Sequence, residues 1–197
     1  MRLFVKICGM TDEASAESAV EAGAQAVGFV FATSPRQVSI DRALEISKVI
    51  PPGVSRVAVF RRPTRLQLAE VISGFQPDLV QADSDTLTGV EGVSTLPVYR
   101  DGSDVVPAGG RFLFEGPVSG VGRQVDLARA ATVARLGEMI LAGGLREENV
   151  GRVVAEVMPF GVDVSSGVET TPGVKSPDMI RSFVAAVRAA EERLVTR

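Results

Sequence analysis

The stretch AVGFVFA at residues 26–32 is an uninterrupted apolar run, and a second run, RVAVF, follows it at residues 56–60. Apolar runs that do not alternate with polar residues are typical of parallel strands with both faces buried. Between the two runs, Ala43, Ile46 and Ile50 recur at helical spacing and form one apolar stripe. The segment therefore predicts a strand, a crossover helix and a second parallel strand.

The same alternation of apolar run and helical stripe continues along the chain. The expected strands cover residues 3–8, 26–32, 56–60, 78–81, 96–99, 111–114, 139–142 and 162–164. Further helical stripes lie at Leu68, Val71, Ile72 and Phe75, at Val150, Val153, Val154 and Val157, and at Ile180, Phe183, Val184 and Val187. Candidate helix N-caps are Thr11-Asp12, Ser39, Thr64, Asp126 and Ser176.

Eight strands joined by helical crossovers predict a (β/α)8 barrel, which we expect to form a single domain over residues 1–197. Only a weak helix fits residues 82–95, because Gly89 and Gly92 interrupt it, and residues 101–110 resemble a loop. We therefore expect shortened or missing helices after strands 4 and 5. An open doubly wound sheet is the alternative, but the first strand is not followed by its Gly-x-Gly-x-x-Gly motif.

Composition narrows the functional classes. The 197 residues are 45% hydrophobic and 23% charged, which excludes global disorder. A net charge of −3 gives no basic excess for nucleic acid, and no apolar run approaches the ~18 residues of a membrane span. Lys6 interrupts any signal-peptide core, and a single cysteine fits a reducing compartment, so we expect a cytoplasmic protein. The lack of histidine excludes imidazole bases and most catalytic zinc sites, and we expect no metal.

Reactive groups of a barrel collect where the strands end and in the loops that follow. After the seventh and eighth expected strands, Gly143 and Gly144 permit close backbone approach, and Ser165, Ser166 and Gly167 offer hydroxyl and N–H donors. A short helical turn beginning near Gly167 would direct its N-terminus at an anion. This pair of loops predicts a phosphate site. The alternative is that the two glycine-containing turns only end their strands.

Three further residues are candidates for chemistry. Cys8 ends the first expected strand and acts as a base if nearby N–H groups or cations lower its pKa from ~8.5. Arg36 follows Pro35, and its planar fork suits bidentate capture of a carboxylate or phosphate. Asp126 lies where a capping carboxylate also faces the mouth of the barrel. Their structural alternatives are a buried small hydrophobe, a solvated arginine and a simple helix cap.

Asp83 and Asp85 follow the fourth expected strand. They suggest a divalent cation only weakly, because no third carboxylate lies at ligand spacing, and we interpret both as solvated. The residues alone thus predict a barrel enzyme acting on a phosphorylated small molecule, with acid–base chemistry shared between a thiol and a carboxylate.

Several motifs resemble the phosphoribosylanthranilate isomerase family. They are KICG at residues 6–9, VGFVF at 27–31, SPR at 34–36, SGVGRQVD at 119–126, LAGGL at 141–145, GVDVSSGVE at 161–169 and PGVK at 172–175. The resemblance runs in family order from Lys6 to Val187, and the motif of the eighth strand is the most specific. Asp83 departs from the pattern, because the family usually has histidine there. If Asp83 lies close to Cys8, its charge would raise the pKa of the thiol.

The resemblance implies a cofactor-free Amadori rearrangement of N-(5-phosphoribosyl)anthranilate to its 1-deoxyribulose 5-phosphate isomer, in tryptophan biosynthesis. It assigns Cys8 as general base, Asp126 as general acid and Arg36 as the partner of the anthranilate carboxylate. The phosphate would bind to Gly144, Ser165, Ser166 and Gly167, and we also expect Gly143 and Asp163 to bind substrate. The family implies a monomer or a homodimer.

Two alternatives stay open. The histidine-pathway isomerase performs the same step on a substrate with two phosphates, but it has aspartate where this chain has Cys8 and needs a second phosphate loop in the first half of the barrel. A non-catalytic phosphate-binding barrel would keep the phosphate site and lose the chemistry. Such a protein would need neither Cys8 nor Asp126.

Overall fold

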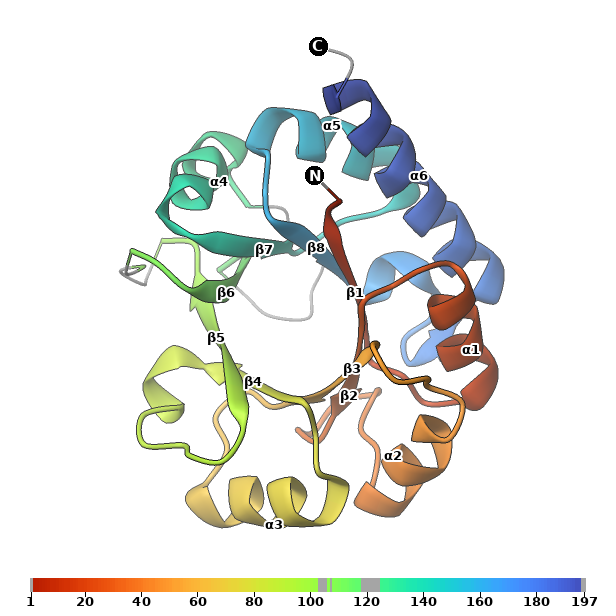
Figure 1. Cartoon of the computed structure of the whole chain (residues 1–197), viewed down its shortest axis with the longest axis vertical. Helices are drawn as coiled ribbons and strands as arrows, with labels where there is room; N and C mark the ends of the chain where they lie inside the picture. Colours follow the sequence, from red (N-terminus) through yellow and green to blue (C-terminus); the bar gives the residue numbers. More distant parts are fainter. Residues whose placement is uncertain (1, 103–105, 107, 118–124, 196–197) are drawn as a thin grey trace.

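The computed structural model describes residues 2–102, 106, 108–117 and 125–195. In these residues eight parallel strands close into a barrel in chain order, and β8 returns to pair with β1 (Figure 1). The strands are Phe4–Cys8 (β1), Ala26–Val30 (β2), Ser55–Val59 (β3), Leu79–Asp83 (β4), Ser94–Arg100 (β5), Arg111–Glu115 (β6), Glu138–Ala142 (β7) and Gly161–Val164 (β8). Each corresponds to one of the apolar runs, so the predicted (β/α)8 barrel is confirmed.

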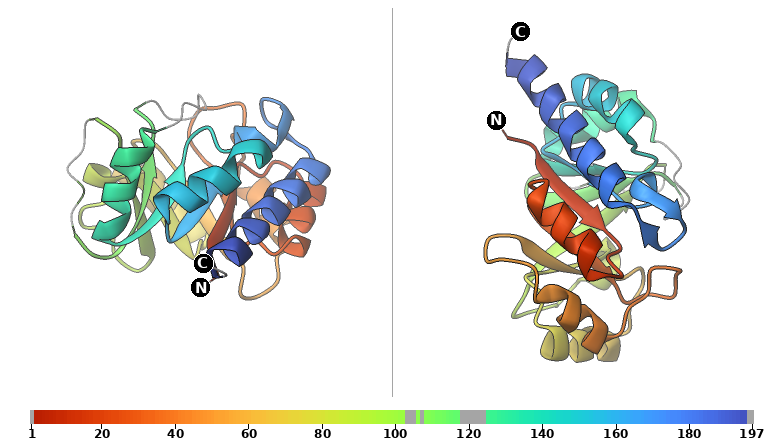
Figure 2. Two further views of the ribbon diagram at one scale, coloured as in Figure 1. Left: turned by 90° about the horizontal axis from the view of Figure 1, so that it is seen from above. Right: turned by 90° about the vertical axis from the view of Figure 1, so that its right-hand side faces the viewer.

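Helices pack around most of the barrel and form its outer layer, which among the described residues has no α-helix beside β5 (Figure 1). The α-helices of the described residues are Glu13–Glu21 (α1), Ile40–Ser47 (α2), Arg65–Phe75 (α3), Leu127–Val133 (α4), Glu147–Val157 (α5) and Pro177–Val195 (α6). The predicted caps at Asp12, Ser39, Thr64 and Asp126 are confirmed, because each side chain accepts a backbone N–H of the first turn. The last helix, α6, packs beside α5 and α1, so the two ends of the helical layer meet there (Figure 2).

The connections after β4 and β5 are reduced, as predicted. After β4 the chain forms only a 3-10 turn at Ser84–Thr86, and the described residues between β5 and β6 contain no helix. Two further 3-10 turns lie at Ala134–Leu136 and Ser166–Val168. Within the described part of the chain, no helix is both long and apolar enough to cross a membrane.

A small hairpin follows β8 and was not anticipated from the sequence. Its strands are Glu169–Thr171 (β9) and Val174–Lys175 (β10), which pair antiparallel. Gly173 turns the chain at φ 88°, and a Cβ there would stand 2.4 Å from the carbonyl oxygen of Pro35. Only glycine therefore allows the hairpin to lie against the loop after β2.

The core has an outer layer between sheet and helices and an inner layer inside the barrel. On β2, Val27 and Phe29 pack outward among the helices, whereas Ala26 and Val30 belong to an interior cluster. Successive side chains of a strand point to opposite faces, so one strand serves both layers. The inner layer also contains buried charged residues, and these position the functional site.

Replacing Phe29 by alanine tests the outer layer. Phe29 is fully buried and contacts Phe75 of α3 edge to face, with ring centroids 5.1 Å apart. We expect Phe29→Ala to lower the free energy of unfolding by about 3–5 kcal/mol in urea denaturation. Leu66→Ala is the control, because Leu66 is 78% exposed and its loss should cost less than about 0.5 kcal/mol. Equal effects of the two substitutions would contradict this packing.

Candidate active site

A cavity of about 240 Å³ opens at the carboxyl ends of the strands. It is lined by residues from β1 to β6 and β8 and from the loops after β2, β3 and β8. Five of the predicted site residues meet here: Cys8, Arg36, Asp163, Ser165 and Ser166. They are distant in the sequence, and the closure of β8 onto β1 brings them together.

The thiol of Cys8 occupies space that a glycine leaves open. Cys8 is opposite Gly28 in the β1–β2 pairing, and a Cβ added at Gly28 would lie 2.9 Å from Cys8 Sγ. Any larger residue at position 28 would displace the sulfur, since real Cβ contacts are longer than this. Gly28 of the VGFVF motif therefore provides the space that the thiol of Cys8 occupies.

A buried ion pair lies beside the thiol. Lys6 of β1 and Asp163 of β8 are opposite each other in the barrel closure, and Lys6 Nζ donates to Asp163 Oδ1 at 2.8 Å. Burial alone would lower the pKa of Lys6, but the charges of Asp163 and Cys8 raise it above its usual value. The contact with Asp163 therefore favours the charged form of Lys6 inside the barrel.

The electrostatic environment of Cys8 is divided. Burial raises the pKa of the thiol above its usual value, the charges of Lys6 and Lys175 lower it in part, and the charge of Asp163 raises it again. The pKa of Cys8 is therefore not lowered, as a ready base would require. The carboxylate that matters to the thiol is Asp163 rather than Asp83.

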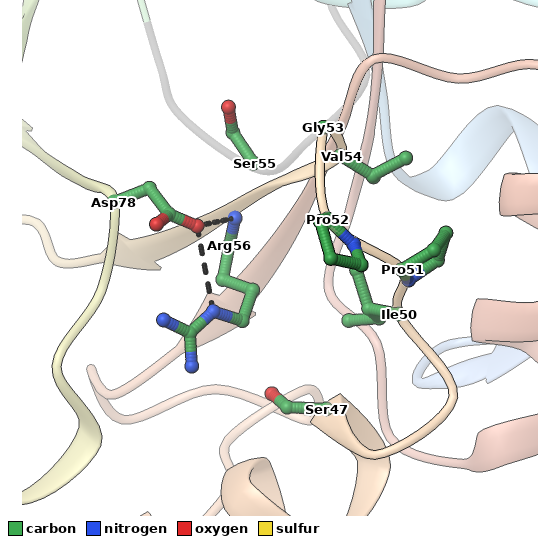
Figure 3. A pocket seen from close by; sticks show the side chains of 9 residues that line it. All are labelled: Ser47, Ile50, Pro51, Pro52, Gly53, Val54, Ser55, Arg56 and Asp78. Atoms are coloured by element: carbon green, nitrogen blue, oxygen red, sulfur yellow. Dashed lines mark hydrogen bonds and ion pairs between the residues drawn. The ribbon is translucent and has the colours of Figure 1, made fainter.

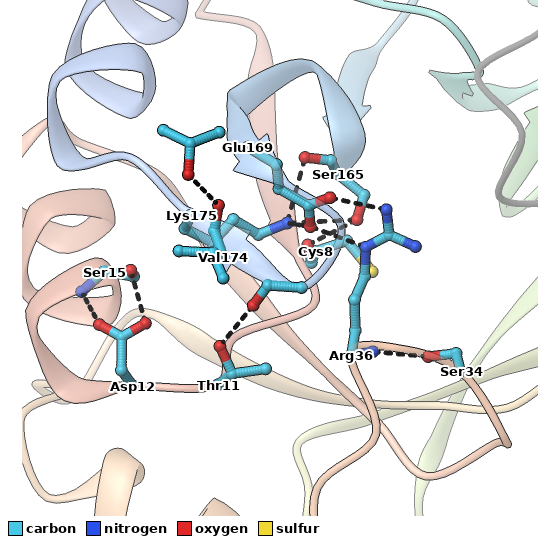
Figure 4. Close-up of polar contacts among 12 residues, drawn as sticks. Cys8, Thr11, Asp12, Ser15, Ser34, Arg36, Ser165, Glu169, Val174 and Lys175 are labelled. Carbon is cyan, nitrogen blue, oxygen red and sulfur yellow. Dashed lines mark hydrogen bonds and ion pairs between the residues drawn. The ribbon is translucent and has the colours of Figure 1, made fainter.

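Glu169 forms ion pairs with two cations, Arg36 and Lys175, close to Cys8 (Figure 4). Its carboxylate accepts Arg36 Nε and Nη2, each at 2.7 Å, and Lys175 Nζ at 2.6 Å. Burial would raise the pKa of Glu169, but the hydrogen bonds and charges of Arg36 and Lys175 lower it to about 2. One edge of the predicted carboxylate-binding fork of Arg36 is thus already occupied by Glu169.

A smaller cavity of about 70 Å³ adjoins the first at the ends of β7 and β8. It is lined by the predicted phosphate-binding residues Gly143, Gly144, Ser165, Ser166 and Gly167, together with Asp163. Gly143 and Gly144 have φ of 98° and 65°, a backbone that other residues rarely adopt. At Gly167, which lies in the 3-10 turn, a Cβ would stand only 1.9 Å from the Leu145 carbonyl oxygen. The two loops therefore form one shell of backbone and hydroxyl donors.

The prediction that Asp83 is solvated is wrong. Asp83 ends β4 with 5% of its surface exposed, and its carboxylate pairs with Arg100 at 2.6 Å and with Arg62 at 3.6 Å. Arg100 also contacts Glu115 of β6 at 3.1 Å, and both of these residues line the larger cavity. The physical reason is that β4 and β5 end side by side and their inward side chains meet. Asp85 is exposed, as predicted.

Asp126 lies outside the linings of the two cavities, unlike the other predicted site residues. It is exposed and caps α4 by accepting Arg129 N–H at 3.0 Å. Its own N–H donates to Asp101 Oδ2 at 3.2 Å. Residues 119–124 of the SGVGRQVD motif lie outside the described residues.

Sequence analysis missed the roles of Lys6, Glu169 and Lys175. A signal was present for the lysines, because the chain has only three and one of them interrupts an apolar strand. For Glu169 no local pattern indicates that its carboxylate faces a loop 133 residues earlier in the chain.

A further hollow of about 430 Å³ lies at the opposite end of the barrel (Figure 3). It surrounds the Pro51–Pro52–Gly53 turn and the amino ends of β3 and β4, where Asp78 accepts Arg56 N–H at 2.7 Å. In barrels of this kind the amino ends of the strands support stability, and catalysis takes place at the carboxyl ends. We therefore place the site in the cavity that contains Cys8.

Among the described residues, no group of three or more Cys, Asp or Glu side chains is arranged to hold a metal ion. A closed parallel barrel with convergent polar groups at its carboxyl-end cavity defines the class of (β/α)8-barrel enzymes.

Within that class, residues 5–186 match the family described as N-(5'phosphoribosyl)anthranilate (PRA) isomerase, and the chain belongs to this family of isomerases. An N-(5'-phosphoribosyl)anthranilate isomerase of Streptococcus pneumoniae (strain Hungary19A-6) is 40% identical over 190 residues, which are 93% of this chain and 95% of that protein. The resemblance in the sequence motifs is confirmed.

Solved structures of phosphoribosyl anthranilate isomerases are similar to this chain over almost its whole length. The phosphoribosyl anthranilate isomerase of Thermotoga maritima superimposes with a TM-score of 0.84 and 31% identity, over 95% of this chain and 99% of that chain. A phosphoribosyl anthranilate isomerase in complex with reduced 1-(o-carboxyphenylamino)-1-deoxyribulose 5-phosphate gives a TM-score of 0.79 and 31% identity, again over 95% and 99%.

The buried pair of Lys6 and Asp163 has a measurable consequence for stability. Lys6→Met leaves an unpaired carboxylate in the barrel, and we expect it to lower the free energy of unfolding by about 3–5 kcal/mol. The double variant Lys6→Met/Asp163→Leu removes both charges and should recover most of this loss in urea denaturation. A double variant no more stable than Lys6→Met would show that the penalty does not come from the unpaired charge.

Proposed function

We propose that the chain converts N-(5'-phosphoribosyl)anthranilate to 1-(2-carboxyphenylamino)-1-deoxyribulose 5-phosphate, without a cofactor, as a step of tryptophan biosynthesis. The observation that carries the proposal is the adjacency of two cavities, one with a buried thiol and the other with a phosphate-sized shell of donors. Family membership supports the same reaction.

The two cavities suggest how the substrate lies. Its phosphate would sit at Gly144, Ser166 and Gly167, where backbone N–H groups and hydroxyls stabilise a dianion. The aromatic ring would lie along the apolar wall formed by Val30, Val59 and Phe60. The sugar carbons would then span the space in front of Cys8.

Arg36 is proposed to bind the anthranilate carboxylate. Glu169 takes Nε and Nη2 on one edge of the guanidinium, so the geometry of the fork is fixed before substrate arrives. Nη1 takes no part in that contact and would donate to the carboxylate. A charge-assisted contact to a preoriented group loses less conformational freedom on binding than one to a mobile arginine.

Two proton transfers complete the reaction. Asp126 would protonate the furanose ring oxygen, the bond from C1 to that oxygen breaks, and the nitrogen lone pair forms the Schiff base. The Cys8 thiolate would then take the proton from C2, the electron pair returns towards nitrogen, and the resulting enolamine tautomerises to the ketone. Acid and base catalysis by placed groups contribute about 10²–10⁴-fold each.

The position of Asp126 is compatible with this role. It begins α4 after β6, so it lies at the same end of the barrel as the cavity. Catalytic contacts in ligand-free proteins are often long and shorten only in the substrate complex. Asp126 is therefore proposed as the acid that reaches the substrate from the rim.

The proposed base and acid are tested by steady-state turnover, followed as the loss of phosphoribosylanthranilate fluorescence. Cys8→Ser should lower kcat by at least about 10²-fold with little change in KM, because an alkoxide is harder to form than a thiolate. Asp126→Asn should abolish turnover while binding of a product analogue survives. Wild-type binding without turnover would instead support the non-catalytic phosphate-binding barrel.

Arg36 is tested by separating KM from kcat. Arg36→Ala should raise KM by about tenfold to a hundredfold, the loss of one charge-assisted contact, with a smaller effect on kcat. Arg36→Lys keeps the charge but loses the planar fork, so its KM should lie between those of the wild type and Arg36→Ala. Arg152→Ala on α5 removes an arginine far from the cavity and serves as the control. An unchanged KM in Arg36→Ala would reject the assignment.

A further inference from the structure

The distribution of lysine is unusual in this chain. Its three lysines are Lys6, Lys48 and Lys175, and two of them have side chains with no solvent exposure. Both buried lysines act to lower the pKa of Cys8. Lys48, in contrast, is exposed on the surface at the end of α2. An ammonium group is costly to bury, so it is rarely found inside a protein without a partner.

Lys175 is fixed by three hydrogen bonds. Its Nζ donates to Glu169 Oε1 at 2.6 Å, to the Ser165 carbonyl oxygen at 3.1 Å and to Ser165 Oγ at 3.3 Å. Ser165 Oγ in turn donates to the carbonyl oxygen of Cys8 at 2.9 Å. An ammonium has three N–H donors, so this arrangement uses all of them and requires the charged form. Lys175 does not line either cavity, and its side chain has no solvent exposure.

The charges that face Cys8 do not balance. Lys6 on β1 is paired with Asp163 on β8, but Glu169 on β9 is shared by Lys175 on β10 and Arg36 of the loop after β2. One carboxylate cannot neutralise two cations, so the group retains positive charge next to the sulfur. The facing residue of β2 is Gly28, which adds no charge. Across the cavity, the charged residues are Arg61, Arg100 and Glu115.

We propose that Lys175 is a positioning residue for the base of the reaction: held by Glu169, its incompletely neutralised charge stabilises the thiolate of Cys8. The inference rests on the proposed function, in which Cys8 is that base. It explains why a fully buried ammonium lies beside the cavities without lining either of them. It also explains how a deeply placed thiol, which burial keeps protonated, reaches its reactive form.

Glu169 has a double part in this arrangement. Burial lowers the pKa of Lys175, and the hydrogen bond and charge of Glu169 oppose this effect and favour the ammonium form. With a carboxylate of its own, Lys175 would be fully neutralised and of little use to the thiol. Sharing Glu169 with Arg36 keeps Lys175 charged and leaves part of that charge for Cys8.

A purely structural role for Lys175 makes a different prediction. Its bonds to Ser165 and Glu169 also fasten the β9–β10 hairpin to the end of β8. If this were its whole role, removing the charge would change stability but not the ionisation of Cys8. The titration of the thiol therefore separates the two roles.

The experiment titrates the single cysteine by the ultraviolet absorbance of the thiolate, with Cys8→Ser as the blank for Tyr99. Lys175→Met should move the midpoint up by about one pH unit, so that the thiolate fraction at a fixed pH below the midpoint falls about tenfold. Lys48→Met, the same substitution at the exposed lysine, should leave the midpoint unchanged. Lys175→Arg keeps the charge, and its midpoint should stay close to that of the wild type.

The double variant Glu169→Gln/Lys175→Met covers the case in which Lys175→Met does not fold. It removes both charges of the pair, so that no unpaired carboxylate of Glu169 remains. It should also titrate at higher pH than the wild type. Turnover at a fixed pH should fall in kcat by the same factor as the thiolate fraction, with little change in KM. Wild-type midpoints in both folded variants would overturn the proposal and leave the proposed function standing. A shifted midpoint in a protein without wild-type turnover would reject the proposed function instead.

Discussion

The ion pair between Lys6 and Asp163 is the interaction on which the rest of the site depends. It joins the first strand of the barrel to the last, across 157 residues of sequence, at the seam where the sheet closes. Two unlike charges placed in a barrel interior are tolerable only when they meet, because each alone would suffer a large desolvation penalty. The pairing of β1 with β8 satisfies this condition. The same register places Cys8 one pleat further along, at the open end of the barrel.

Around the thiol, burial and charge act in opposite directions. Burial holds the sulfur protonated, while two lysines favour its anion and Asp163 opposes them. A thiolate formed in such a place is a strong base, because the burial that disfavours it also raises the pKa of its thiol. The arrangement around Glu169 regulates this balance with cations that belong to the protein. Asp83 contributes to the opposite wall of the cavity through Arg100, so the change from the family's usual histidine need not disturb the sulfur.

Two neighbouring cavities of different character share one rim of the barrel. The glycines at 143, 144 and 167 bring backbone close to the smaller cavity, where side chains would collide or strain the chain. The larger cavity carries the titratable groups and an apolar wall. Asp163 and Ser165 line both cavities, so a ligand anchored in one is held at a set distance from the sulfur in the other.

The order of strands and helices, their caps and the thin connections after β4 and β5 follow from local patterns, because burial on two faces or on one stripe leaves a periodic record in neighbouring residues. Cys8 and the glycine-rich turns could be selected because they lie where these strands are expected to end. The environment of those residues was not, because ion pairs such as Arg36 with Glu169 join residues 133 positions apart. Asp83 shows the limit most clearly: as a lone carboxylate after a strand it resembles a solvated residue, and only the neighbouring end of β5 supplies its arginine. Which charges meet depends on the register of barrel closure, and that is a property of the assembled sheet.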